Sequence, residues 1–90
     1  MQYDVSAPRA TATGTLVNYG TRLKGLVIVG TATAGSVVFR DGGAGGTIRL
    51  TIDIVANGEK DITIPGEGIL FSTDIHVTLT NVTSVVGFIA

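Results

Sequence analysis

The sequence predicts an all-β protein, a compact antiparallel β-sandwich of seven or eight strands. Three observations predict it. Several segments alternate apolar and polar residues with a period of two, which is the pattern of a strand with one face buried. Turn sequences rich in glycine separate these segments at intervals of about 8–12 residues. The chain also has 13 glycines and 13 threonines, which are poor helix formers and suit turns and strands.

Alternation is clearest in three segments, residues 47–54, 61–64 and 74–80. In residues 47–54, TIRLTIDI, every even position is aliphatic and every odd position is polar. Because side chains alternate between the two faces of a strand, we expect the even positions to face the core. In the last segment, the same reasoning places the aliphatic residues Ile75, Val77 and Leu79 inward.

Other segments are apolar on both faces or alternate weakly. Residues 25–29 and 84–89, and more briefly 36–40, are typical of strands covered on both sides. Residues 9–17 contain small side chains and suit an edge strand or a strand packed closely on a neighbour. Periodicity does not reveal which strands pair, so a jelly roll and other Greek-key orders both remain open.

The chain is predicted to form one domain. Residues 10–90 make up the single β-sandwich domain, and residues 1–9 form an N-terminal arm or a first edge strand. Pro8 keeps the residue before it extended, and the strand pattern begins after it.

Composition favours self-association. Hydrophobic residues are 44% of the chain and charged residues only 14%, against about 25% in an average soluble domain. The chain has no cysteine, so disulfides cannot supplement a small core. We therefore expect a homo-oligomer, with a trimer favoured.

Nucleic acid and membrane are not expected as partners. The net charge is −1 and the six basic residues are scattered, whereas binding to a phosphate backbone needs a basic patch. No segment approaches the ~20 consecutive apolar residues of a membrane helix.

The residues that could carry chemistry do not form a catalytic pattern. The glycine-rich run 41–46 lacks the Lys-Ser/Thr and the helix that a phosphate-binding loop requires. Asp41 and Asp74 could meet at one end of the sandwich and hold a cation, but capping of turns is the favoured interpretation. His76 is expected at the surface or in an interface. We predict no catalytic residue, no metal ligand and no cofactor, and hence no enzyme.

Three residues are assigned to a partner interface: Tyr3, Arg9 and Tyr19. Tyr3 and Arg9 lie in the N-terminal arm, and Tyr19 lies in a turn. Tyrosine and arginine are enriched where proteins bind one another, because each offers a large contact area with a polar end.

Residues 21–90 also resemble small virion-associated proteins of tailed bacteriophages. The resemblance rests on Arg22-Leu23-Lys24-Gly25, on residues 33–43 (TAGSVVFRDGG) and on residues 65–69 (PGEGI), followed by Asp74 and by residues 79–85 (LTNVTSV). It lies in the order of these motifs and includes no catalytic signature.

The resemblance implies a structural protein of a phage virion. The most specific expectation is a capsid decoration, or cement, protein that binds the major capsid protein and stabilises the capsid lattice. Such a protein is located in the virion after assembly in the host cytoplasm. The alternative is a tail or fibre component, including a module that binds the host surface.

Overall fold

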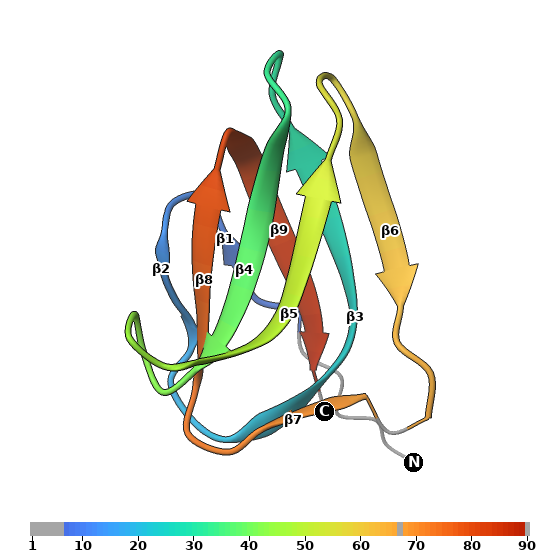
Figure 1. Cartoon of the computed structure of the whole chain (residues 1–90). Coiled ribbons are helices and arrows are strands. Elements are labelled where there is room, and N and C mark those ends of the chain that lie inside the picture. The colour runs from blue at the N-terminus through green and yellow to red at the C-terminus, as the bar shows by residue number, and fades with distance from the viewer. Residues whose placement is uncertain (1–6, 67, 90) are drawn as a thin grey trace.

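The computed structural model describes residues 7–66 and 68–89, and in these residues it contains nine strands in two antiparallel sheets that pack face to face (Figure 1). The strands are β1 (Arg9–Ala10), β2 (Gly14–Val17), β3 (Thr21–Gly30), β4 (Gly35–Asp41), β5 (Thr47–Ile54), β6 (Glu59–Thr63), β7 (Ile69–Phe71), β8 (Ile75–Thr80) and β9 (Val82–Ile89). The predicted all-β antiparallel sandwich is confirmed. Its strands outnumber the seven or eight expected, because residues 9–17 divide into β1 and β2, one in each sheet, and because residues 69–71 form the short strand β7, which the sequence pattern does not predict.

The strand order follows from folding the chain as one long hairpin. β4 pairs with β5, β3 with β6 and β7, β2 with β8, and β1 with β9. The hairpin is rolled so that β9 also pairs with β3, and β8 with β4. The resulting sheets have the orders β1-β9-β3-β6 and β2-β8-β4-β5, and β7 extends the β6 edge of the first. This is the strand order of a jelly roll.

The core lies between the two sheets and comes mainly from their central strands. Ile75 and Val77 of β8 are fully buried, as their alternation predicts, while Leu79 at the end of the strand is half-buried. The largest side chains with no exposed surface are Phe39, Phe71, Leu23, Leu26, Ile28, Ile75, Val37, Val77 and Val85.

One predicted inward residue faces outward. Phe39 pairs with Leu50, but the next residue of β4, Arg40, pairs with Ile48, so Arg49 is an extra residue in β5. This β-bulge reverses the alternation beyond it, because one additional residue moves the following side chains to the opposite face. Ile48 therefore lies on the outer face and is 52% exposed.

The outer face of the five-stranded sheet is apolar near its centre. Val27 of β3 and Val86 of β9 pair with each other on this face and are half-buried, and Val29 is 36% exposed. The sequence predicts cover on both faces of residues 25–29 and 84–89. In the part of the chain that the structure describes, the second sheet covers only the inner face.

Removal of a core side chain should be far more costly than removal of an exposed one. Leu26 is fully buried and Leu70 is 51% exposed. We expect Leu26→Ala to lower the free energy of unfolding by about 2–5 kcal/mol, through lost burial and the cavity left behind. Leu70→Ala should change it by about 0.5 kcal/mol or less. Urea denaturation measures both, and equal losses would contradict this arrangement of the core.

Candidate functional site

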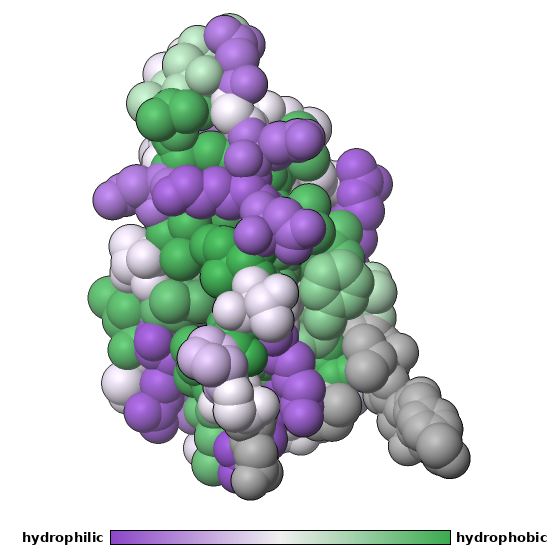
Figure 2. Space-filling model, turned by 90° about the vertical axis from the view of Figure 1, so that its right-hand side faces the viewer, coloured by the Kyte–Doolittle hydropathy of each residue, from purple (hydrophilic) through white to green (hydrophobic). Residues whose placement is uncertain are grey.

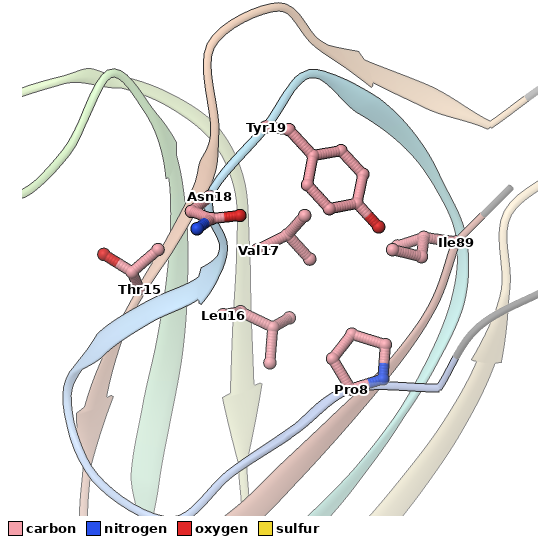
Figure 3. Close-up of a pocket in the computed structure, with 7 residues that line it drawn as sticks. All are labelled: Pro8, Thr15, Leu16, Val17, Asn18, Tyr19 and Ile89. Atoms are coloured by element: carbon pink, nitrogen blue, oxygen red, sulfur yellow. The ribbon is translucent and has the colours of Figure 1, made fainter.

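A hollow of about 590 Å³ opens at one end of the sandwich, beside the turn that joins β2 to β3. Its lining comes from both sequence extremes of the described chain and from residues 15–19, as Figure 3 shows. The lining residues are Pro8, Thr15, Leu16, Val17, Asn18, Tyr19 and Ile89. This volume is within the range of about 300–1,000 Å³ that is usual for pockets that bind ligands or side chains.

A bulge in β2 forms one wall of the hollow. Thr15 pairs with His76 and Val17 with Ile75, so Leu16 is the extra residue. Val17 is buried in the core, and Leu16 packs against the margin of the core while remaining half-buried. The bulge thus brings two consecutive aliphatic side chains to the hollow, where a regular strand would turn one of them away.

The turn after β2 determines where Tyr19 lies. Gly20 packs against the carbonyl oxygen of Ser72, and a Cβ atom added to Gly20 would lie 2.6 Å from that oxygen. Only glycine permits this close approach. Tyr19 is 54% exposed, and its ring projects over the hollow toward Ile89 (Figure 3).

The lining of the hollow is mainly apolar. Its floor and walls are the aliphatic side chains of Leu16, Val17 and Ile89 together with Pro8, and its polar groups are those of Thr15, Asn18 and Tyr19. None of these seven described residues is an acid, a histidine, a lysine or an arginine, so the lining offers no acid–base pair. It could hold an apolar side chain of another protein, with the tyrosine hydroxyl at its rim.

The predicted interface residues are not all brought together. Tyr19 lines the hollow. Arg9 is exposed and pairs with Val86, which places it on the outer face of the five-stranded sheet. Its neighbour Pro8 reaches the hollow instead, and the carbonyl of Pro8 accepts a hydrogen bond from the N–H of Gly87 at 3.0 Å. Tyr3 lies outside the described residues.

Sequence reasoning missed most of the lining. Leu16 and Ile89 belong to segments predicted as strands, and nothing in their periodicity indicates a common site. The break in alternation at Leu16-Val17 is the signal that could have revealed the bulge.

The two aspartates considered as cation ligands, Asp41 and Asp74, do meet at this end of the sandwich. Each caps the loop that adjoins the other. The Asp41 carboxylate accepts hydrogen bonds from the N–H and hydroxyl of Ser72, both at 3.0 Å, and from the N–H of Thr73 at 2.9 Å. The Asp74 carboxylate accepts hydrogen bonds from the N–H groups of Gly42 and Gly43, at 3.0 and 3.1 Å. We call this reciprocal pair the aspartate clasp. It confirms the capping interpretation.

The clasp also explains the glycine-rich run. Gly42 and Gly43 have φ values of 106° and 83°, in the left-handed region that favours glycine. Their N–H groups are directed at Asp74, and β5 follows the run as predicted, so the loop is a connection closed by a carboxylate. No group of three or more His, Cys, Asp or Glu residues that could hold a metal ion occurs in residues 7–66 and 68–89.

Hydrogen bonding changes the acidity of Asp41. The N–H groups of Ser72 and then Thr73 are the largest causes, and they lower the pKa of the Asp41 carboxyl from 3.8 to about 2 by stabilising its charged form. Arg49 lies 3.6 Å away, but its side chain is 44% exposed, so this ion pair adds little.

The clasp should make stability depend on pH. A carboxyl whose pKa is lowered by folding stabilises the folded state above its unfolded pKa, and this contribution disappears as the pH falls from about 4 to about 2. We expect Asp41→Asn to be less stable than the parent protein at pH 7, and the difference to shrink across this interval. Asp61→Asn, which changes an exposed aspartate, should leave the profile close to that of the parent. Chemical denaturation at a series of pH values measures the free energy of unfolding of the parent and both variants. A difference between the parent and Asp41→Asn that does not change with pH would contradict the role of the clasp.

His76 is more buried than expected. It lies between Thr15 of β2 and Arg40 of β4 and is only 8% exposed, because β8 has a neighbour on each side. Its Nδ1 atom is buried and has no hydrogen-bond partner among the described residues. Of the predicted surface or interface position, the surface position is therefore wrong: period-two alternation identifies the outer face of a strand but not how far its neighbours cover that face.

Residues 7–66 and 68–89 contain no helix that is long and apolar enough to cross a membrane. Comparison of the chain with models of protein families, with curated proteins and with solved structures found no match.

Proposed function

We propose that this chain is a structural protein without enzymatic activity that binds another protein in a tailed-phage virion, most specifically as a capsid decoration protein on the major capsid protein. The observation that carries the proposal of protein binding is the apolar hollow beneath the half-exposed ring of Tyr19. The assignment to a virion rests on the resemblance of residues 21–90 to small virion-associated proteins.

The hollow has the properties of an anchor site. Tyrosine is enriched among the residues that dominate binding energy, and such residues usually lie beside well-packed apolar pockets. Here the ring of Tyr19 borders a hollow whose base consists of the buried residues Val17 and Ile89. An apolar side chain from a partner would lose its water on entry without leaving any charge unpaired.

The fold suits repeated binding on a lattice. Two packed sheets and the aspartate clasp hold the turn that carries Tyr19 against its neighbours. The turn therefore loses little conformational entropy when it binds a partner. A modest affinity per copy is sufficient where many copies act together on one particle, because linked contacts strengthen each other.

The number of copies per virion should distinguish a capsid from a tail location. We expect hundreds of copies in purified particles of the phage that encodes the chain, measured by quantitative mass spectrometry against the major capsid protein. A tail or fibre component would be present in about three to eighteen copies, as the closed symmetry of such assemblies requires. That result would select the alternative, and absence from the particle would contradict both locations.

Tyr19 should contribute to particle binding through its ring. We expect Tyr19→Ala to weaken binding of the purified protein to particles that lack it by about 30-fold, which corresponds to roughly 2 kcal/mol for an anchor residue. Tyr19→Phe is the matched control: it keeps the ring and should bind within a fewfold of the parent. Co-sedimentation over a range of concentrations measures this. Equal binding by the alanine variant would show that the hollow is not the contact.

A further inference from the structure

The four edges of the two sheets are protected unequally. In the described chain, β1 has two residues, and β6 bears the consecutive charges of Glu59, Lys60 and Asp61 with the three-residue β7 beyond it. β2 has four residues and is bulged. Short strands, bulges and charges are the usual means by which proteins prevent edge strands from pairing with other chains. β5 is the longest of these edge strands, with eight residues. It has a bulge at Arg49 and the charges of Arg49 and Asp53, but residues 50–54 form a regular stretch without proline or lysine.

The sequence of β5 is complementary to itself in the antiparallel direction. If two copies of the strand pair about Thr51, then Arg49 lies opposite Asp53 of the second copy, and this ion pair occurs twice. On the other face, Leu50 lies opposite Ile52 of the second copy, also twice. Unlike charges and aliphatic pairs directly opposite each other are the cross-strand combinations that stabilise antiparallel sheets.

Only this register combines the two kinds of pair. A continuous sheet requires that opposite residues face the same side, so the register can change only in steps of two. One such step would place Arg49 opposite Thr51, and the step in the other direction would place it opposite Val55. The charges therefore select Thr51 as the centre of the pairing.

The residues of this edge are accessible. Thr51 and Asp53 are exposed, and the side chain of Arg49 is 44% exposed, although its guanidinium already lies 3.6 Å from Asp41 of the same chain. Leu50 and Ile52 are half-buried where the core meets the open side of the sandwich. This side faces the viewer in Figure 2, where hydrophobic surface is visible between hydrophilic clusters. Residues 50–52 lie in the regular part of β5, and the bulge at Arg49 lies at the end of the proposed ladder, where Arg49 meets Asp53 of the second copy.

We propose that a second copy of this chain pairs with β5 about a two-fold axis at Thr51, so that two four-stranded sheets become one sheet of eight strands. Such a contact is the same on both copies and closes on itself, which is the usual geometry of a dimer. β2 and β5 are opposite edges of their sheet, so the two hollows remain free at the far ends of the joined sheet. The apolar excess of the chain predicts association, and this edge assigns it to two copies rather than three.

A charge reversal at the edge tests the pairing. Light scattering coupled to size exclusion should give the mass of a dimer for the parent chain at micromolar concentrations. Asp53→Lys places two lysines opposite two arginines and should raise the dissociation constant at least tenfold. Asp61→Lys is the matched control, with the same change of charge on the edge strand β6 of the other sheet, and should remain a dimer. A parent monomer, a parent trimer, or equal effects of the two variants would overturn the proposal.

A cysteine placed on the axis tests the register without altering charge. Directly opposite residues of an antiparallel pair have Cα atoms about 4.5–5.5 Å apart, within the range that a disulfide spans. Because the chain has no cysteine, Thr51→Cys introduces the only thiol, and mild oxidation should link the two copies covalently. Thr63→Cys, an exposed position on β6, should not form this link. Failure of Thr51→Cys to cross-link, or equal cross-linking of both variants, would overturn the two-fold pairing and leave the proposed role of Tyr19 standing.

Discussion

The two central strand pairs, β3 with β9 and β4 with β8, form the constraint on which the rest of the structure depends. They supply most of the fully buried side chains, and each joins an early strand to a late one. With so few residues, the core is less complete at the edges of the sheets, although Val17 of β2 and Ile54 of β5 still belong to it. The hollow beside β2 and the half-buried aliphatic residues of β5 are the two places where it ends. The proposed binding surfaces are therefore a direct result of how a small core is built.

The aspartate clasp has a different role from the core. A buried carboxylate such as that of Asp41 is costly unless hydrogen bonds stabilise it, and here the N–H groups of two tight loops bind both Asp41 and the half-buried Asp74. Each aspartate lies next to the loop that the other holds, so neither loop can move without disturbing both. The turn of Tyr19 packs on the same region through Gly20 and Ser72. The position of the tyrosine is consequently linked to the clasp.

Local patterns in the sequence predicted what local physics determines. Alternation identified the strands and the inward positions Ile75 and Val77, and the absence of a helix after the glycine-rich run excluded a phosphate-binding loop. The prediction that Ile48 faces the core was wrong, and the bulge at Leu16 was not foreseen, because a bulge depends on the neighbouring strand. Alternation could not predict the strand order for the same reason, because the order also depends on which strands become neighbours. Tyr19 could be selected as an exposed aromatic residue in a turn. The hollow beneath Tyr19 could not be predicted, because Pro8 and Ile89 come together only through the pairing of β1 with β9.

The rolled hairpin also determines how quickly this protein can fold. Its β4–β5 hairpin closes a short loop, whereas the pairing of Arg9 with Val86 closes a loop of nearly the entire chain. Loop closure costs more entropy as the loop lengthens, and folds dominated by such distant contacts reach the native state in roughly milliseconds to seconds. We expect the hairpin to form early and the pairing of β1 with β9 to come last. The hollow, which Pro8 and Ile89 line, would then be complete only when folding is complete.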